Sequence, residues 1–343
     1  MNWQKIDIVT ESGNTVSAQA PVIISASRST DIPAFYSEWL VNRLTRNYVV
    51  WKNPFNGSLL YVTFKYARLI VFWSKNPRPI IKHLDFIKEK IPNFYFQYTL
   101  NDYDKEKLEP NVPNLQYRID TFLELSEKIG KEKVIWRFDP YILTDKISVD
   151  DLLKKTENIG NQLKNHTNKL VFSYADIKTY KKVMLNLKRS NIRYHEFTPS
   201  TMIEIAEGLK KLNEKWKFKI ATCAEEFDLK KYGIGHNHCI DDDLIIELFH
   251  DDKILMEYLG IKFPEPELFH QEAMGIKTKD IKDKGQREFC GCIISKDIGE
   301  YNTCPHLCEY CYANTSKELA LNNYKKHKEN PNNEMILGEN NNE

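Results

Sequence analysis

The amino-acid sequence predicts an α/β protein whose parallel strands form a complete or partial (β/α) barrel. Three observations indicate this class. Short runs of β-branched and aromatic residues alternate along the chain with stretches of helical spacing, which is typical of a parallel sheet. The runs are apolar throughout, as in strands that helices cover on both faces. Six or more such units are too many for a small doubly wound domain, and they suit a barrel.

The predicted elements follow one another in a regular order. Residues 1–20 form a polar β-hairpin, because the turn residues Ser12-Gly13-Asn14 separate two short apolar runs. Residues 21–314 form a single barrel domain. Strands are expected at 22–25, 69–73, 95–99, 134–138, 170–173 and 218–222. Helices are expected at 34–45, 79–90, 115–129, 149–164 and 200–215. Residues 315–343 are rich in Asn, Lys and Glu, which predicts a short helix and a partly disordered polar tail.

The composition excludes some classes of protein. The chain has 343 residues, of which 41% are hydrophobic, enough for one large domain or two modest ones. Its apolar runs are only a few residues long, whereas a membrane-spanning helix needs about 20 residues. The first residues lack the basic start and apolar stretch of a signal peptide, so we expect a cytoplasmic protein. With 49 basic and 48 acidic residues, the net charge of +1 does not support a nucleic-acid partner.

Three cysteines near the C-terminus form the clearest motif. Cys304, Cys308 and Cys311 have the spacing C-x3-C-x2-C. Clustered cysteines in a cytoplasmic chain indicate metal ligands before disulfides. Three thiolates on one loop can hold three corners of a 4Fe–4S cube, which leaves the fourth iron open to a small molecule. The alternative is a zinc site in which Cys308 and Cys311 form one ligand pair and Cys304 with His306 forms the other.

The other four cysteines match the ligand count of a second metal site. Cys290-Gly291-Cys292 is a tight C-x-C, Cys223 lies at a predicted strand end, and Cys239 follows two histidines. Four thiolates would suit a closed 4Fe–4S cluster, which we favour, or a tetrahedral zinc. His236 and His238 could replace a cysteine as ligands of this second site. The alternative is that Cys223 and Cys239 are ordinary buried thiols.

Polar side chains follow almost every predicted strand. In a barrel these positions converge on the rim where active sites are built, so we expect a binding cavity there. The candidate residues are Ser27, Arg28, Ser29, Thr30, Asp31, Lys75, Gln97, Arg137 and Asp139. Two alternatives stay open. Asp31 precedes Pro33 and could be a helix N-cap, and Arg137 with Asp139 could be a buried structural pair.

The cysteine segment resembles the cluster-binding loop of the radical S-adenosylmethionine superfamily, including an aromatic residue, Tyr310, directly before the last cysteine. This resemblance implies that S-adenosylmethionine fills the open iron position through its amino and carboxylate groups, and that reduction cleaves its sulfonium. It places Tyr310 near the adenine, residues 27–31 at the methionyl end with Arg28 on the carboxylate, and the other polar candidates at the ribose or the substrate. An electron donor such as ferredoxin or flavodoxin is the expected partner.

The position of this loop in the chain is unusual. In the superfamily the loop follows the first barrel strand, whereas here it comes at the end of the chain. Residues 293–301 can supply a strand that leads into the loop. If that strand pairs beside residues 22–25, the barrel is restored with the chain opened at another point, which is a circular permutation.

Further motifs extend over nearly the whole chain. They are SASRSTDIP at 25–33, FWSKNP at 72–77, WRFDP at 136–140, TCAEE at 222–226 and the two cysteine motifs at 290–292 and 304–311. Together they resemble the domain of unknown function 1848 family, which implies no agreed reaction. A weaker likeness to spore photoproduct lyase and its relatives makes DNA repair a candidate, although the neutral charge argues against a large DNA footprint.

These resemblances imply a radical S-adenosylmethionine enzyme with a 4Fe–4S cluster and an unknown substrate, without assigning any catalytic residue. Two other functions stay open. One is a non-catalytic binding module that zinc or an iron–sulfur cluster stabilises, with nucleic acid as a possible ligand. The other is an iron–sulfur electron-transfer or sensor protein.

Overall fold

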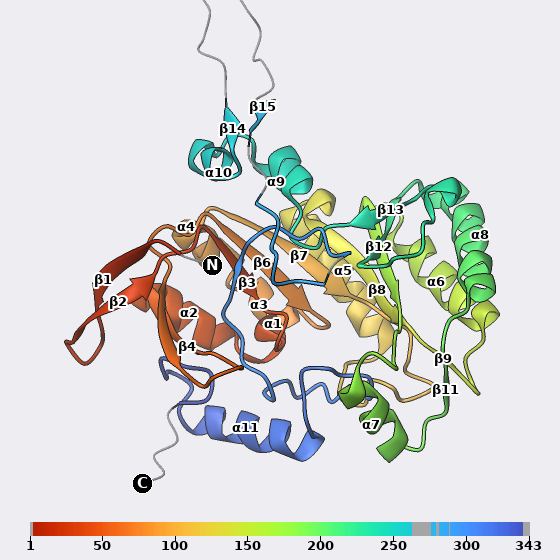
Figure 1. Ribbon diagram of the computed structural model, residues 1–343, viewed down its shortest axis with the longest axis horizontal. Helices are drawn as coiled ribbons and strands as arrows, with labels where there is room; N and C mark the ends of the chain where they lie inside the picture. The colour runs from red at the N-terminus through yellow and green to blue at the C-terminus, as the bar shows by residue number, and fades with distance from the viewer. Residues whose placement is uncertain (1–2, 263–275, 279–280, 288, 339–343) are drawn as a thin grey trace, which may run out of the picture.

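A parallel sheet forms the centre of the protein. The structure is a computed structural model that describes residues 3–262, 276–278, 281–287 and 289–338. The sheet has eight strands in the order β13-β12-β10-β8-β7-β6-β3-β16 (Figure 1). Its strands are β3 (Ile23–Ala26), β6 (Leu69–Ser74), β7 (Asn93–Thr99), β8 (Val134–Tyr141), β10 (Lys169–Tyr174), β12 (Lys219–Cys223), β13 (Ile234–Asn237) and β16 (Lys296–Asp297). The predicted α/β class with a parallel sheet is thus confirmed.

The sheet is open, and a closed barrel is not shown. Among the described residues, the edge strands β13 and β16 do not pair with each other. β16 comprises only two residues and offers few backbone groups for a second ladder. One backbone hydrogen bond, from Ile293 N to Ile240 O at 3.0 Å, joins the segments beside the two edges.

The last strand of the chain lies beside the first strand of the sheet. β16 pairs in parallel with β3 through Lys296 with Ile24 and Asp297 with Ser25. This is the pairing that the C-terminal position of the cysteine loop predicts, although the strand is shorter than the expected 293–301. The cysteine loop therefore begins next to the carboxyl end of β3.

Helices cover one face of the sheet in chain order. α3, α5, α6 and α8 each contact the next, and they pack on apolar strand residues such as Phe72 and Trp136. Local sequence explains their starts: Asn114 caps α5, Ser148 forms a capping box at α6, and Pro199 opens α8. The helices are α1 (Ile32–Phe35), α2 (Ser37–Arg46), α3 (Arg78–Ile81), α4 (Leu84–Lys90), α5 (Leu115–Ile129), α6 (Val149–Leu163), α7 (Lys181–Arg189), α8 (Pro199–Trp216), α9 (Asp242–Phe249), α10 (Lys253–Tyr258) and α11 (Lys317–Glu329).

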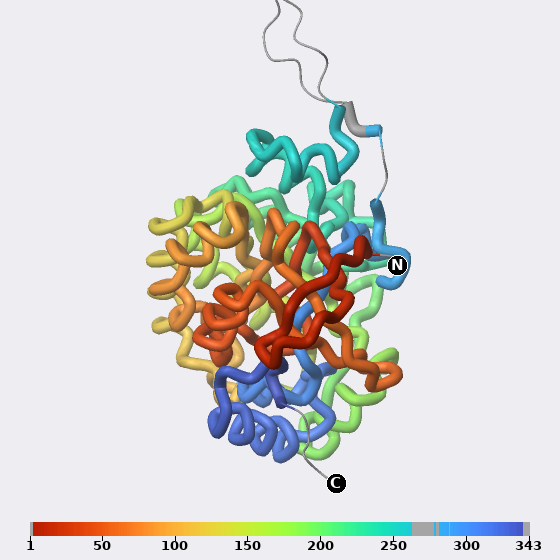
Figure 2. The backbone as a smooth tube through the Cα atoms, turned by 90° about the vertical axis from the view of Figure 1, so that its left-hand side faces the viewer, coloured from red at the N-terminus to blue at the C-terminus, as the bar shows by residue number. Residues whose placement is uncertain are grey.

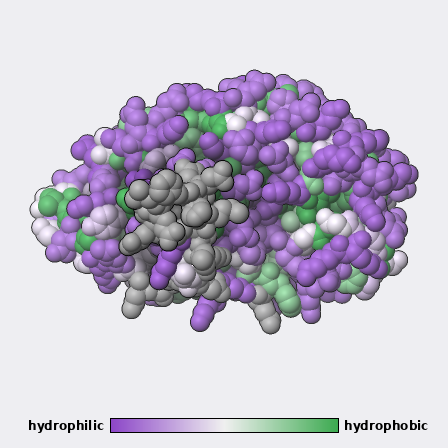
Figure 3. All heavy atoms as spheres, turned by 90° about the horizontal axis from the view of Figure 1, so that it is seen from above, coloured by the Kyte–Doolittle hydropathy of each residue, from purple (hydrophilic) through white to green (hydrophobic). Residues whose placement is uncertain are grey.

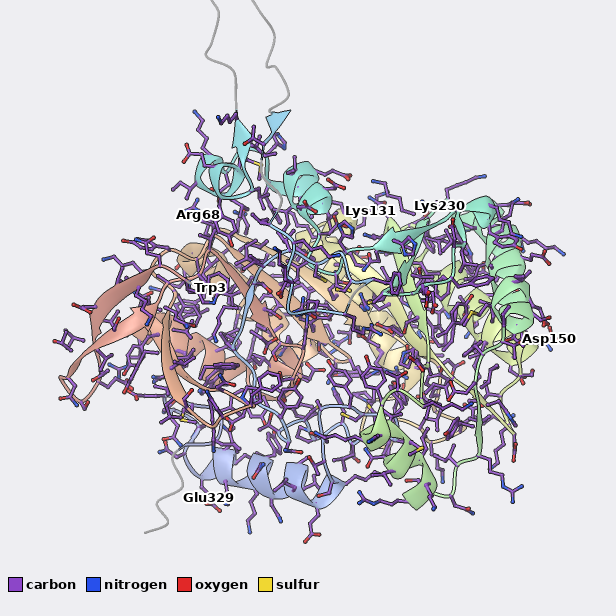
Figure 4. The ribbon with its side chains drawn as sticks, in the orientation of Figure 1. Trp3, Arg68, Lys131, Asp150, Lys230 and Glu329 are labelled. Carbon is purple, nitrogen blue, oxygen red and sulfur yellow. The ribbon has the colours of Figure 1, made fainter. Side chains whose placement is uncertain are left out.

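The opposite face of the sheet is covered by a later part of the chain. Val71, Tyr95 and Ile135 on this face pack with α9, α10 and the segment that contains Cys290 and Cys292. Arg68, which directly precedes β6, pairs with Asp252 at the start of α10 at 2.8 Å (Figure 4). The helix-covered and loop-covered faces thus form two separate apolar layers.

The predicted N-terminal hairpin is confirmed as β1 (Lys5–Val9) and β2 (Thr15–Gln19). It does not stand alone, because β2 pairs with β5 (Leu59–Thr63), which pairs with β4 (Tyr48–Lys52). The sequence interpretation missed β4 and β5. Short two-stranded sheets are formed by β9 (Leu143–Thr144) with β11 (Tyr194–His195) and by β14 (Ile261–Lys262) with β15 (Ile276–Lys277).

The C-terminal segment packs against this N-terminal sheet (Figure 2). After the predicted short helix, observed as α11, Val50 N donates to Glu334 O at 2.9 Å, and Met335 and Ile336 are buried. The expectation that the tail has little to bury therefore does not hold for residues 330–338, in which the buried side chains of Met335 and Ile336 provide an anchor. Leu337 N donates to Glu300 Oε2 at 3.3 Å, and burial raises the pKa of Glu300 to about 7. Residues 339–343 lie outside the described part of the chain.

The visible surface is mainly polar. In the view from above, hydrophobic residues form small separate patches among hydrophilic ones (Figure 3). Among the described residues, none of the helices combines the length and the apolar character needed to cross a membrane.

Candidate functional site

Polar side chains gather at the carboxyl edge of the sheet, on the face opposite α3, α5, α6 and α8. Successive strand residues point to opposite faces, so Trp73 shares a face with buried Val71, and Arg137 shares one with Ile135. Near the carboxyl ends this face carries Ser25, Trp73, Gln97, Arg137, Ser173 and Cys223. The apolar residues of this face pack against the covering segment. The polar residues near the carboxyl ends of the strands form the candidate site.

The loop with Cys304, Cys308 and Cys311 follows β16 directly. Burial raises the pKa of all three thiols, because it disfavours the charged thiolate. A bound metal would reverse this effect, since a thiol that coordinates a metal is deprotonated. Asn314 holds the loop closed: its backbone N donates to Cys311 Sγ at 3.3 Å, and its Nδ2 donates to Cys304 O at 2.8 Å.

The sulfurs of this loop are too widely spaced for one zinc ion. Among the described residues, no group of three potential ligand atoms within 4.8 Å of one another contains a cysteine. Four sulfurs around one tetrahedral zinc, at 2.3 Å from it, lie about 3.8 Å apart. A cluster with separate irons at its corners fits such spacing better.

Asp31 joins this loop to the ends of β3 and β6. Its Oδ1 caps α1 by accepting from Ala34 N at 3.0 Å, and its Oδ2 accepts from Lys75 N at 2.7 Å. The same Oδ2 lies 2.8 Å from His306 Nε2. The N-cap alternative is therefore observed, and both carboxylate oxygens are engaged. Asp31 therefore occupies His306 Nε2, while His306 Nδ1 lies 3.5 Å from Asn111 O.

Tyr310 anchors the loop in a buried polar cluster. Its hydroxyl accepts from Lys75 Nζ and Asn101 Nδ2, both at 2.9 Å, and donates to Glu109. Lys75 Nζ also pairs with Glu109 Oε1 at 2.7 Å, and Arg118 Nη1 lies 3.4 Å from Glu109 Oε2. Burial opposes ionisation of Glu109, but the two cations lower its pKa below the usual value. The adenine contact of Tyr310 stays a prediction, and the observed contacts are structural.

Asp297 on β16 organises the residues that follow β3. It accepts hydrogen bonds at 2.8–2.9 Å from Ser25 Oγ, Ser27 Oγ, Arg28 N and Gly299 N. Ser29 Oγ also lies 3.4 Å from its carboxylate. The approach is close enough that a Cβ at Gly299 would lie 1.8 Å from Ser27 Oγ, so only glycine fits. The hydroxyls of Ser27 and Ser29, predicted to bind the cofactor, are thus directed to Asp297.

Arg28 and Arg137 both lie against Trp73, each with its guanidinium carbon 5.3 Å from the ring centroid. Arg28 Nη2, Thr30 Oγ1 and Trp73 Nε1 are buried and have no hydrogen-bond partner among the described residues. Buried polar groups are nearly always paired, so each of these atoms is a candidate partner for a polar ligand. A carboxylate and hydroxyl groups, as in S-adenosylmethionine, fit these donors.

Arg137 contacts both the ring of Trp73 and Cys239, which is one of the other four cysteines. Its Nη1 donates to Gln97 Oε1 at 3.1 Å and to Cys239 Sγ at 3.2 Å, and its Nε donates to Asp139 Oδ2 at 3.1 Å. Asp139 also accepts a hydrogen bond from Ser173. The structural pair of Arg137 and Asp139 is therefore present at the carboxyl edge of the sheet.

The four remaining cysteines lie together on the same edge. Cys223 Sγ is 3.3 Å from Cys239 Sγ, and Cys239 N donates to Cys292 Sγ at 3.3 Å. A side-chain hydrogen bond links Cys292 with Cys290. All four are free thiols.

A cavity of about 280 Å³ borders the segment that leads into the first cysteine loop. Ser29, Trp51, Glu300 and Tyr301 are among the residues that line it. None of its lining residues in the described part of the chain is a cysteine. The cavity thus borders the segment before the loop and does not reach its cysteines.

Sequence reasoning missed several residues of the site. Asp297, Glu109 and Asn101 bind predicted residues but belong to no motif. The only available signal was the position of Asp297 in the expected last strand. Trp73 belongs to the motif FWSKNP and is the last residue of the predicted strand 69–73. Nothing in the sequence indicated that two arginine side chains lie against its ring.

The comparisons with known proteins identify a family. A family model described as "Domain of unknown function (DUF1848)" matches residues 23–313, which include both cysteine groups. A solved structure from Bacteroides thetaiotaomicron, described as a "putative alpha-L-fucosidase", is 13% identical and covers 56% of this chain and 82% of that chain. Its TM-score of 0.25 is too low to inform the fold or the function. No protein in the curated set matches the sequence.

Proposed function

The chain belongs to the family described as Domain of unknown function (DUF1848), and we propose that it is a radical S-adenosylmethionine enzyme that holds a 4Fe–4S cluster on Cys304, Cys308 and Cys311. The observation that carries this proposal is the position of the three-cysteine loop. It starts at the carboxyl edge of a parallel sheet, beside a strand end with buried, unpaired polar atoms. Active sites of parallel α/β folds are built at this edge.

The cluster would be held by three protein thiolates and would keep one iron open to S-adenosylmethionine. When bound, it supplies the electron that cleaves the sulfonium, and a protein such as ferredoxin or flavodoxin would deliver that electron. Burial raises the pKa of Cys308 and Cys311, and the positive charge of Lys75 partly opposes this rise. Lys75 would therefore offset part of the negative charge at the thiolates. Asn314 N stabilises the Cys311 thiolate by donating to its sulfur.

Arg28 and Thr30 are the residues best placed to bind the methionyl end of S-adenosylmethionine. Arg28 Nη2 and Thr30 Oγ1 are unpaired, whereas Asp31 and the hydroxyls of Ser27 and Ser29 are bound to groups of the protein. A guanidinium can hold a carboxylate with two parallel hydrogen bonds. Trp73 and Arg137 would then border the rest of the cofactor, with Trp73 Nε1 as a further donor.

The test is whether an iron of the loop is open to S-adenosylmethionine. Anaerobically reconstituted protein is reduced, and its electron paramagnetic resonance spectrum is recorded with and without S-adenosylmethionine. We expect the cofactor to change the spectrum, and we expect the change to vanish in Cys308→Ser but to persist in the exposed control Glu318→Gln. A reduced cluster whose spectrum ignores the cofactor would instead indicate an electron-transfer or sensor protein.

A further inference from the structure

Cys223, Cys239, Cys290 and Cys292 come from separate parts of the chain and meet between the two edges of the open sheet. Cys223 ends β12, Cys239 follows the edge strand β13, and Cys290 and Cys292 precede the other edge strand, β16. The two pairs of cysteines therefore approach the gap from opposite sides.

The sulfur atoms lie close together, and a side-chain hydrogen bond between Cys239 and Cys292 crosses the gap. Cys223 Sγ lies 3.3 Å from Cys239 Sγ. Cys292 Sγ accepts from Cys239 N at 3.3 Å and from Ile240 N at 3.5 Å. Backbone N–H donors to sulfur are typical partners of metal-bound thiolates. A lone buried cysteine is common, but four adjacent free thiols from three segments indicate a shared ligand.

The surroundings suit a negatively charged metal centre. Four thiolates around Zn²⁺, or around a 4Fe–4S core of charge 2+, carry a net charge of about −2. Arg137 Nη1 and Asn237 Nδ2 both donate to Cys239 Sγ at 3.2 Å, and the Arg28 guanidinium interacts electrostatically with Cys239 and Cys292. Cationic and amide donors thus face the sulfurs within a buried setting.

The backbone between Cys290 and Cys292 is closely packed. A Cβ at Gly291 would lie 2.0 Å from the ring of His238, so the C-x-C turn requires glycine. His238 Nδ1 lies 3.5 Å from Asp242 Oδ1, and His236 is exposed. The four thiols, and not these two histidines, therefore form the ligand set.

We propose that these four cysteines form a second, closed thiolate–metal centre that fastens the strand β16 to the opposite edge of the sheet. The strand ladder does not close the sheet, and the Ile293–Ile240 hydrogen bond is the backbone link beside the gap. A metal at this point ties β16 to β12 and β13. It thereby holds Asp297 and the loop of Cys304, which follow on the same segment. The inference is independent of the proposed reaction, because none of its ligands belongs to that loop.

The test uses the full chain with the first loop disabled. In Cys304→Ser/Cys308→Ser/Cys311→Ser, anaerobically purified, iron, sulfide and zinc are measured per chain. We expect about four irons with sulfide, because no three of these sulfurs lie within 4.8 Å of one another, as a single zinc ion would require. About one zinc per chain would still support a thiolate–metal centre, but it would show that the sulfurs move together to bind the ion. We expect the additional changes Cys290→Ser/Cys292→Ser to reduce the metal content more than tenfold. A triple variant that is folded but binds neither metal would overturn the proposal.

A second measurement covers the case in which the variants do not fold. In the wild-type protein, thiol alkylation is mapped by mass spectrometry before and after a chelator that extracts iron and zinc. We expect the four thiols to be protected before chelation and modified at least tenfold faster afterwards, with a lower melting temperature. Equal alkylation rates with and without the chelator would contradict the proposal. Neither experiment involves S-adenosylmethionine, so its failure is distinct from failure of the proposed reaction.

Discussion

Asp297→Ala is expected to lower the free energy of unfolding by about 3–5 kcal/mol. The magnitude follows from the four groups that donate to this carboxylate: Ser25 Oγ, Ser27 Oγ, Arg28 N and Gly299 N. A buried donor left without an acceptor costs about 1–3 kcal/mol. Ser25 and Ser27 are only 0% and 3% exposed, and the two backbone N–H groups cannot turn to other acceptors. We use about 1 kcal/mol for each donor, since the hydroxyls can rotate.

The assay is urea-induced unfolding of metal-loaded protein, followed by intrinsic fluorescence. Asp228→Ala is the matched control, because Asp228 is exposed and accepts only a local hydrogen bond from Lys230 N at 2.9 Å. The control should change stability by less than about 1 kcal/mol. If Asp297→Ala unfolds at the same urea concentration as Asp228→Ala, β16 does not organise the residues after β3, and the account of the site fails.

Three further predictions concern single side chains. Arg28→Lys should weaken S-adenosylmethionine binding about 10- to 100-fold in equilibrium dialysis, since lysine cannot make a bidentate contact, while exposed Arg193→Lys should bind normally; affinities within twofold would remove Arg28 from the site. Glu109→Gln should lower the free energy of unfolding by about 3–5 kcal/mol, because it leaves the buried ammonium of Lys75 without its carboxylate, whereas Arg118 keeps its ion pair with Asp104; equality with Glu318→Gln in urea would disprove this. Burial raises the pKa of Glu300 from 4.5 to about 7, so the folded state binds more protons and stability should fall by about 2–3 kcal/mol as the pH rises through this range. Glu300→Gln should remove that fall in melting temperature, and parallel pH profiles would contradict the assignment.

The sequence allowed the parallel sheet to be predicted because its strands have a strong local signal. Runs such as 69–73 and 134–138 are continuous and apolar, and the helices between them have caps such as Asn114 and Ser148. The strands β4 and β5 were missed although they form a local antiparallel hairpin around the turn residues 53–58; only the pairing of β5 with β2 is a tertiary property. Sheet closure was also beyond reach, since it depends on how many residues the short strand β16 contributes to a ladder.

The site could be predicted in outline but not in its hydrogen bonding. The cysteine loop and the polar strand ends lie at the same edge of the sheet, as the sequence predicted, and the site itself stays a proposal. The sequence did not show that Ser27 and Asp31 are occupied by partners within the protein, because those partners, Asp297 and His306, lie far away in the chain. Arg28, which the resemblance places on the methionyl carboxylate, has an Nη2 atom without a partner among the described residues, unlike the hydroxyls of Ser27 and Ser29.

The formation of 5′-deoxyadenosine tests the central proposal most directly. Iron-loaded, reduced protein is incubated with S-adenosylmethionine under anaerobic conditions, and the product is quantified by chromatography. We predict at least one equivalent per chain for the wild type and for Glu318→Gln, and none for Cys304→Ser, Cys308→Ser or Cys311→Ser. An iron-loaded, reduced wild-type protein that forms no 5′-deoxyadenosine would contradict the proposed function.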